Sequence, residues 1–265
     1  MALPISHPKI DDKKGKSCPV TGQSHEYQAP TLGDIRSVCP AINTMANHGY
    51  IRRDGKNITP MAICRGLKAC YGLSSFLAFF LTIGGWILIK KFSLTSIDLF
   101  ELGLHNGVEH DASVVHKDCP PGDKDAPTDI QPDLVNEFAS EIVNAASASA
   151  GRKLAEEEVV VTGHDIVRTR IRREKLSKPL SGMHAEIARG EMAIILGVWN
   201  QRVEGKEGVP LPWMRRWLGE ERLPDGWRPD HTHTLPQVVK TASAMRAEMK
   251  SLRQAEEVAA ATATQ

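Results

Sequence analysis

The sequence predicts a mostly helical, single-domain fold with an extended polar arm at its N-terminus. Apolar residues recur at helical spacing along most of the chain, helix-capping residues begin several of these runs, and 265 residues suffice for one domain. Hydrophobic residues make up 41% of the chain and charged residues 25%, which is a globular composition. We expect the arm to span residues 1–37, the main domain residues 38–236, and a C-terminal helix and tail residues 237–265.

Charge and cysteine content limit the classes of function. Lys and Arg together number 33 and Asp and Glu 32, so the formal net charge is +1. Nucleic-acid-binding proteins normally carry a clear basic excess, so we expect no nucleic-acid partner. Five cysteines at irregular spacing indicate free thiols rather than a disulfide framework. The first residues lack the apolar core of a secretory signal, so an intracellular location is expected, and the oligomeric state stays open.

Proline and capping residues predict the first elements. Four prolines between residues 1 and 37 favour an extended arm over a helix or strand. Thr59 followed by Pro60 is typical of a helix start. Thr95 with Asp98 predicts another helix, which runs through Leu104.

The middle of the chain alternates between loop and helix signals. Residues 119–132 are rich in proline and aspartate and predict a loop, after which Asp133 opens an amphipathic helical run. Thr162 with Asp165 predicts a further helix, whose basic stretch, residues 168–175, we expect to be a solvated face.

The last third adds two helices and the only strand candidate. Residues 190–199 are strongly apolar and helical in pattern, and Thr234–Pro236 predicts the start of a C-terminal helix. Val159–Val161 is β-branched throughout, but it is too isolated in the sequence to predict a sheet.

Residues 70–89 form a stretch of twenty residues without a charge. As one helix it would span roughly 30 Å at about 1.5 Å per residue, the thickness of a bilayer core. A transmembrane helix and a helix buried within the protein are therefore both open from this segment alone.

Cys39 precedes Pro40 at a predicted helix start. As the N-cap residue, it would lie beside the unpaired amides of Ala41 and Ile42. Those donors and the positive helix end favour a thiolate with a lowered pKa, as in a metal ligand or nucleophile. A chance Cys-Pro pair at a helix start is the alternative.

Two further groups have the composition of a reaction site. Glu109, His110 and Asp111 follow an Asn-Gly turn, and together they could bind a hard cation and handle a proton. Glu191 lies at the head of an apolar helical run, where partial burial would raise its pKa toward the range of a general acid–base. Solvated acidic side chains are the alternative for both.

The order of these motifs resembles that of the fungal haem-thiolate peroxidases, the chloroperoxidase and unspecific peroxygenase superfamily. The matching text is VCPAINTMANHGYIRRDGKNIT at residues 38–59, EHDAS at residues 109–113, and then Glu191. The tryptophan-rich residues 213–227 are also similar. The resemblance covers roughly residues 18–236.

The resemblance implies a role for each matching residue. Cys39 is implied to be the axial ligand of the iron of haem b, and Glu191 the distal acid–base residue oriented by His110. The side chain of Glu109 and the backbone oxygens of His110 and Ser113 are implied to hold Mg²⁺ or Mn²⁺. We expect the other histidines to be structural or at the surface, including His48, His105, His116, His164 and His184.

The resemblance also implies the activity. The expected enzyme is a peroxygenase or peroxidase that uses hydrogen peroxide to oxygenate or oxidise small apolar or aromatic molecules through a ferryl intermediate. Aromatic polyketides of secondary metabolism are a substrate class implied by the resemblance. A halide-oxidising peroxidase of the same family is one alternative. A non-catalytic membrane-associated protein that uses residues 70–89 is an alternative from a different class.

The chain departs from the family pattern near both expected faces of the haem. Val38 replaces the usual proline before the ligand, and Val108 and Ile194 are aliphatic, which favours a roomier substrate pocket. If Cys39 and residues 109–113 contact one haem, a single bilayer crossing between them is excluded. We therefore expect residues 70–89 to fold into the protein, with shallow peripheral membrane contact through Trp86 and Phe92 still open.

Overall fold

Local capping signals begin several helices of the computed structural model, which describes residues 24–203 and 205–263. Helices α1 (Pro40–Asn47) and α2 (Pro60–Tyr71) each have proline in the first turn, and the Thr59 side chain accepts a hydrogen bond from the Ala62 amide at 3.2 Å. Helix α5 (Gly163–Leu176) begins with the predicted Thr162–Asp165 capping box. These predicted helix starts are confirmed.

The apolar segment at residues 70–89 is divided between two helices. Helix α2 ends at Tyr71, and Gly72 has a φ of +68°, a left-handed conformation that glycine adopts without strain. Helix α3 (Ser75–Leu88) then starts, with the Ser74 hydroxyl accepting a hydrogen bond from the Leu77 amide at 3.2 Å. The reading of the whole segment as one helix is therefore wrong.

Helix α3 is folded against the protein, as predicted, but only on one side. Leu77, Ala78, Thr82 and Trp86 are buried, and the Trp86 indole donates a hydrogen bond to the Thr95 carbonyl at 2.8 Å. Trp86 is therefore buried, so the membrane contact through its side chain that the sequence left open does not occur. Among residues 24–203 and 205–263, no helix combines the length and the apolar character needed to cross a bilayer.

The connection between α3 and helix α4 (Pro132–Ala150) is mostly irregular. The helix predicted from Thr95 through Leu104 is the shorter 3-10 helix η1 (Leu99–Gly103). Its start is fixed by a hydrogen bond from the Asp98 amide to Glu101 at 2.9 Å, so Thr95 is not its cap. The predicted loop at residues 119–132 is confirmed up to Gln131.

A small sheet corrects the expectation that the valine run is isolated. Strand β1 (Val160–Val161) pairs antiparallel with β3 (Lys206–Pro210), which also pairs antiparallel with β2 (Gln201–Val203), in the order β1-β3-β2. The sequence of β3 contains a lysine, a glutamate, a glycine and a proline, so it carries no strand signal of its own. Its pairing depends on contacts that are distant in the sequence.

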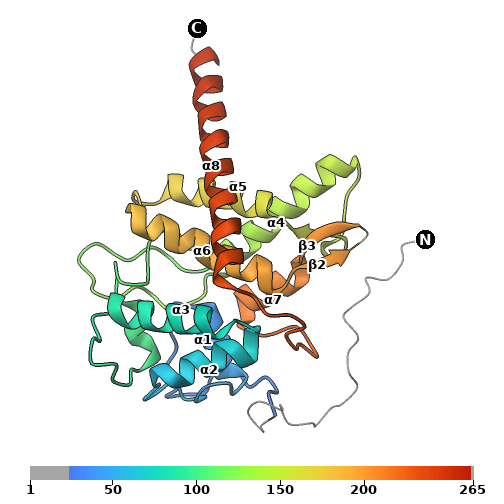
Figure 1. Ribbon diagram of the computed structural model, residues 1–265. Coiled ribbons are helices and arrows are strands. Elements are labelled where there is room, and N and C mark those ends of the chain that lie inside the picture. The colour runs from blue at the N-terminus through green and yellow to red at the C-terminus, as the bar shows by residue number, and fades with distance from the viewer. Residues whose placement is uncertain (1–23, 204, 264–265) are drawn as a thin grey trace.

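The remaining helices complete the fold around the centre. Helix α6 (Gly182–Val198) starts earlier than predicted, α7 (Leu211–Glu220) follows β3, and the short 3-10 helix η2 (Glu156–Glu158) precedes β1. Helices α1–α3 lie at one end of the molecule and α4–α6 at the other, with α7 between them (Figure 1).

Helix α8 (Leu235–Ala263) is the longest helix of the described residues. Its first turns pack against α6 and α5, and its last turns project beyond the body of the protein (Figure 1). Residues 24–39, which lead into α1, contain a turn but no helix or strand.

Candidate active site

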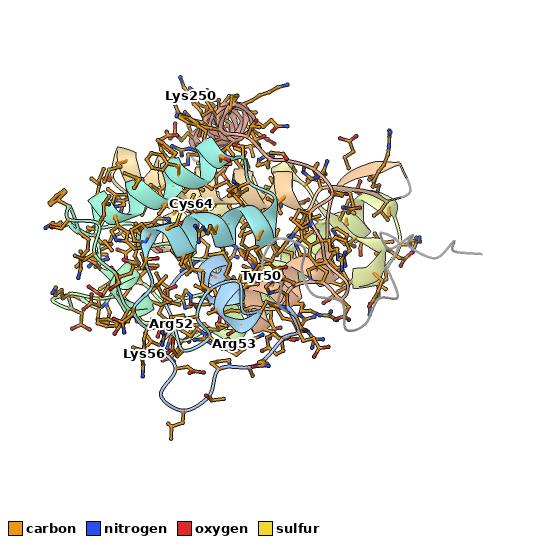
Figure 2. All side chains as sticks on the ribbon, turned by 60° about the horizontal axis from the view of Figure 1, so that its bottom comes forward. Tyr50, Arg52, Arg53, Lys56, Cys64 and Lys250 are labelled. Carbon is orange, nitrogen blue, oxygen red and sulfur yellow. The ribbon has the colours of Figure 1, made fainter. Side chains whose placement is uncertain are left out.

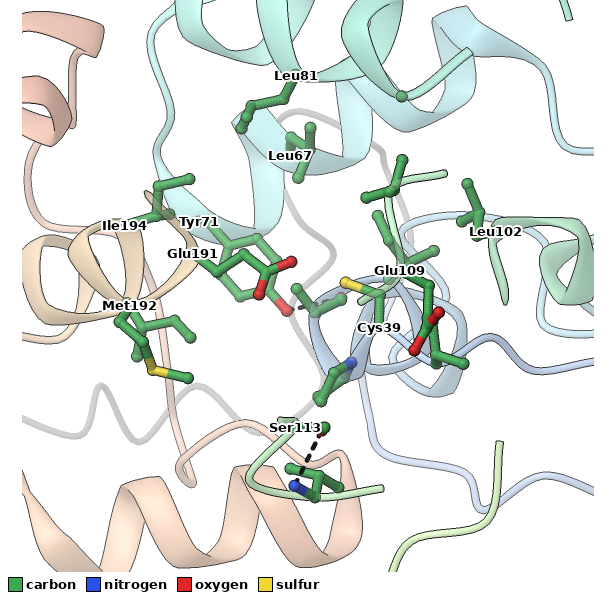
Figure 3. A pocket seen from close by; sticks show the side chains of 18 of the residues that line it. Cys39, Leu67, Tyr71, Leu81, Leu102, Glu109, Ser113, Glu191, Met192 and Ile194 are labelled. Atoms are coloured by element: carbon green, nitrogen blue, oxygen red, sulfur yellow. Dashed lines mark hydrogen bonds between the residues drawn. The ribbon is translucent and has the colours of Figure 1, made fainter. Parts of the chain in front are cut away.

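A cavity of about 260 Å³ lies between the two ends of the fold. Its walls come from α1, α2 and α3 on one side and from α6 and α7 on the other, together with the irregular residues 108–116. Most of the lining is apolar, and Figure 3 shows this space from close by. The titratable side chains on its wall are those of Cys39, Tyr71, Glu109, His110, His116, Arg170 and Glu191.

Cys39 is the N-cap residue of α1, and its sulfur points into the cavity (Figure 3). The backbone amides of Ile42 and Ala41 lie near this sulfur and lower the pKa of the thiol, as the Cys-Pro start predicted, but the Cys39 side chain makes no capping hydrogen bond to α1. Burial nevertheless raises the pKa of the Cys39 thiol to about 12, and the negative charge of Glu191 adds to the rise.

The expected low pKa of Cys39 is therefore wrong for the protein chain alone. Two amides do not offset the cost of burying a thiolate in an apolar cavity. A metal cation bonded to sulfur does offset that cost, because a coordinated thiol is deprotonated outright. The chemistry of this site thus suits a metal ligand better than a free nucleophile.

A buried hydrogen-bond chain holds Cys39 from behind. The Cys39 amide donates to the Ser37 hydroxyl at 3.1 Å, and both the amide and the hydroxyl of Ser37 donate to the Asn43 side-chain oxygen at 2.8 and 3.0 Å. The Asn43 side-chain amide in turn donates to a carboxylate oxygen of Glu221 at 2.6 Å. Burial raises the pKa of Glu221 to about 7. Ser37, Asn43 and Glu221 were not identified from the sequence.

Glu191 and His110 meet on another wall of the cavity. Glu191 lies in the middle of α6 rather than at its start, and His110 Nε2 is 3.6 Å from its carboxylate oxygen Oε2. The His110 side chain is only 7% exposed, whereas that of Glu191 is 45% exposed. His110 Nδ1 lies 2.7 Å from the Asp111 carbonyl, to which it donates, and this fixes the ring so that Nε2 faces Glu191.

Burial and Glu191 act in opposite directions on His110. Burial lowers the pKa of the imidazole, but the nearby Glu191 carboxylate and its negative charge raise it, and the net shift of the pKa is upward. Figure 3 shows the Glu191 carboxylate and the Cys39 sulfur pointing toward one another from different sides of the cavity. The structure thus brings together three residues that are widely separated in the sequence.

The predicted cation ligands are only partly gathered. One carboxylate oxygen of Glu109 lies 2.8 Å from His105 Nδ1, and ligand atoms of His105, Glu109 and Asp111 all lie within 4.8 Å of one another. Burial raises the pKa of Glu109. The backbone oxygen of Ser113 accepts a hydrogen bond from Arg173 Nε at 2.7 Å. His105 was expected to be structural, so the sequence did not identify it as a partner of Glu109.

Two arginines of α5 correct the expectation of a solvated basic face. Arg170 is 2% exposed and Arg173 9% exposed, although Arg168 on the same helix is exposed. Arg170 donates to the Ala112 carbonyl at 2.8 Å and pairs with Glu174 at 3.0 Å. Ala112 has a φ of +66°, an unfavourable value for a residue with a side chain, so the arginines hold a strained loop in place.

Three further side chains of the cavity wall are those of Val108, Ile194 and His116. Val108 and Ile194, the aliphatic residues expected to flank the substrate, both line the cavity. His116 also lines it, with Nδ1 3.0 Å from the Asp129 carbonyl and with its buried Nε2 lacking a hydrogen-bond partner. No sequence signal distinguished His116 from the other histidines, because its place depends on the fold of an irregular loop.

Comparison with known proteins identifies one matching family and several relatives that are named as peroxidases or peroxygenases. Residues 25–232 match the family described as "Peroxidase, family 2". An aromatic peroxygenase from Coprinellus radians is 32% identical over an alignment of 126 residues, and the match covers 39% of this chain and 46% of the relative. A dothistromin biosynthesis peroxidase from Dothistroma septosporum is 42% identical over 65 residues, 24% of this chain and 16% of the relative.

A chloroperoxidase from Leptoxyphium fumago is 41% identical over 58 residues, 22% of this chain and 15% of the relative. Each of these matches spans less than half of the relative's own length. The family match, in contrast, extends from residue 25 to residue 232 and contains Cys39, Glu109, His110 and Glu191. This protein belongs to peroxidase family 2, the fungal haem-thiolate peroxidases.

Proposed function

We propose that this protein is a haem-thiolate peroxygenase or peroxidase that uses hydrogen peroxide to oxygenate or oxidise apolar and aromatic molecules. The observation that carries the proposal is that the Cys39 thiol and the Glu191–His110 pair face one apolar cavity. A soft metal ligand opposite a proton-transfer group is the arrangement that thiolate-ligated peroxide chemistry requires.

The residues present fit a haem. Cys39 would hold the iron, with the amides of Ala41 and Ile42 sharing the charge on its sulfur. The apolar walls suit a porphyrin, and the unpartnered Nε2 of His116 offers a buried hydrogen-bonding group to a polar substituent. When bound, the haem would supply the redox chemistry that draws oxidising equivalents from hydrogen peroxide.

The chain itself supplies proton transfer and positioning. The Glu191 carboxylate would accept a proton from one oxygen of hydrogen peroxide and return it to the other, so that water leaves. His110 would hold this carboxylate through Nε2, and its own ring is fixed by the hydrogen bond to the Asp111 carbonyl.

The apolar residues of the cavity wall favour an organic molecule as the substrate. Val108 and Ile194 leave an aliphatic surface near Glu191, to which apolar and aromatic molecules would bind by burial of apolar area. Relatives named aromatic peroxygenase and aromatic peroxidase support this class. The relative named for dothistromin biosynthesis supports a role in a biosynthetic pathway.

A divalent cation at Glu109 is a further part of the proposal. The buried Glu109 carboxylate, together with His105 and Asp111, gives one imidazole nitrogen and two carboxylates whose ligand atoms lie within 4.8 Å of one another. Mg²⁺ prefers oxygen ligands, and Mn²⁺ also accepts imidazole. Metal analysis of the protein before and after dialysis against a chelator tests this, and a protein that never contains Mg²⁺ or Mn²⁺ contradicts it.

Haem ligation can be tested directly with the purified full chain. The Soret band of the ferrous carbon monoxide complex distinguishes thiolate from nitrogen ligation, and we expect the thiolate spectrum. Cys39→Ala should abolish it, whereas Cys64→Ala, at a partly buried position on α2 that does not line the cavity, should leave it unchanged. An unchanged spectrum in Cys39→Ala contradicts the proposal.

Substrate class needs a separate measurement. The same preparation with hydrogen peroxide should convert aromatic and alkyl molecules faster than it oxidises chloride or bromide. Halide oxidation without any organic oxygenation would favour the chloroperoxidase activity named for one relative.

A further inference from the structure

The outer face of α3 is an exposed row of large apolar side chains. Phe76, Phe79, Phe80 and Ile87 are 65%, 58%, 52% and 51% exposed. At 3.6 residues per turn these positions lie within about 100° of the helix circumference, so they form one continuous stripe. We call these four residues the α3 outer face.

This exposure is not a consequence of a missing core. Five of the six phenylalanines of the chain are at least 48% exposed, while Trp86, Trp199 and Trp217 are each no more than 2% exposed. The fold therefore buries three of its five tryptophans and leaves most of its phenylalanines exposed. A contiguous exposed apolar patch on a folded protein marks an interaction surface.

The charge around this face favours an anionic partner. Between Gly55 and Ile97, a stretch that contains both α2 and α3, there are five basic residues and no acidic residue. They are Lys56, Arg65, Lys68, Lys90 and Lys91. Lys56 lies outside both helices, away from α3 in Figure 2, and Lys91 forms an ion pair with Glu101 at 2.5 Å. The two helices pack against each other and lie side by side in Figure 2, so Arg65 and Lys68 on α2 and Lys90 after α3 give this region its positive charge.

Apolar and basic character together select among possible occupants. A second copy of this chain would bring the same positive charges against each other across the contact, which is unfavourable. An anionic lipid surface accepts both properties, because aromatic side chains enter the acyl boundary while lysines and arginines contact phosphate groups. At about 1.5 Å per residue, the 14 residues of α3 form a helix roughly 21 Å long that can lie in this boundary.

We propose that the α3 outer face docks on an anionic lipid bilayer, with α3 lying parallel to the membrane plane. The opposite face of the same helix lines the cavity through Leu81, Thr82, Gly85 and Trp86. A docked protein therefore holds its cavity one helix diameter from the lipid. Apolar molecules concentrate in the lipid and would be close to the cavity. The docking itself does not depend on the proposed function, because it uses none of the residues assigned to haem or peroxide.

Liposome flotation of the full chain tests this proposal. We expect the protein to float with vesicles of phosphatidylcholine and phosphatidylserine, and to bind vesicles of phosphatidylcholine alone more weakly. The triple variant Phe76→Ser, Phe79→Ser, Phe80→Ser should lose at least about tenfold in affinity, because each buried ring contributes to insertion.

A matched control separates this face from general hydrophobicity. Leu176, Val239 and Val258 are 68%, 55% and 65% exposed on α5 and α8, and their replacement by serine should leave vesicle binding unchanged. Circular dichroism checks that both triple variants remain folded. Absence of vesicle binding, or equal binding to neutral and anionic vesicles, overturns the proposal. So does a concentration-dependent dimer, measured by light scattering, that only the phenylalanine variant abolishes.

Discussion

Nε2 of His110 lies 3.6 Å from the carboxylate of Glu191, and the two residues come from an irregular loop and the middle of a helix. The pairing joins a buried, oriented imidazole to a carboxylate that is accessible from the cavity. Such a pair can keep the carboxylate in place while it gains and loses a proton.

Replacing Glu191 with Gln should remove proton transfer but retain the shape of the site. We expect peroxide-dependent turnover to fall by about 10²–10⁴-fold, the usual contribution of a general acid–base group. Stopped-flow measurement of the reaction with hydrogen peroxide checks this. Haem content and the carbon monoxide spectrum should stay at the wild-type level, and undiminished turnover would exclude the assigned role.

The wall residue Ile194 should control the size of the accepted substrate. Ile194→Phe adds volume to the cavity wall near Glu191, so KM should rise for bulky aromatic substrates and stay nearly constant for small ones. Steady-state kinetics over a series of aromatic molecules of increasing size measures this. Val239→Phe, at an exposed position on α8, is the control. Equal effects on small and bulky substrates would show that Ile194 does not limit access.

Arg170 should be important for stability because it is buried and holds the cavity loop. Arg170→Met removes the donor to the Ala112 carbonyl and one partner of Glu174, and we expect a loss of about 3–5 kcal/mol in the free energy of unfolding. Urea unfolding measures it. Arg168→Met, at an exposed position on the same helix, should change the free energy by no more than about 0.5 kcal/mol. Similar losses of stability in both variants would contradict the role of Arg170 in holding the loop at Ala112.

Local signals predicted those parts of the fold that depend on neighbours in the sequence. The proline and threonine starts of α1, α2 and α5 were correct, because a cap involves residues only a few positions apart. The sheet was missed, because β3 pairs with β1 through residues about 50 positions apart and has no strand composition of its own. A pairing of this kind is set by tertiary packing.

In the candidate site, too, features set by neighbouring residues were predicted, whereas contacts between distant residues were missed. The position of Cys39 beside the amides of Ala41 and Ile42 follows from a local Cys-Pro start. The hydrogen bond between Asn43 and Glu221, which supports this segment, joins residues 178 positions apart. The burial of Arg170 was also missed, because a periodic basic run normally faces solvent and only the strained Ala112 loop recruits it. The residues that the motif order singled out line one cavity, but the electrostatic balance at the Cys39 thiol was not predicted.

The Glu221 carboxyl should make the free energy of unfolding fall as pH rises, the reverse of what a salt-bridged carboxylate does. Burial raises its pKa from 4.5 in the unfolded chain to about 7, so the native state binds the proton more tightly. Its contribution is therefore fully present below about pH 4.5 and is lost as pH rises toward about 7. The full change is about 3 kcal/mol on the scale of 1.36 kcal/mol per pKa unit.

A difference measurement is needed because His48 acts in the opposite direction. Burial lowers the pKa of His48 to about 4, so its contribution to stability is lost as pH falls toward that value. Glu221→Gln keeps a side-chain oxygen for Asn43 and removes only the titration. The free energy of unfolding of Glu221→Gln minus that of wild type should therefore increase between about pH 4.5 and pH 7, measured by urea unfolding at several pH values. A difference that is flat across this window would mean that Glu221 is ionised at neutral pH and that the hydrogen-bond chain behind Cys39 ends in a charge.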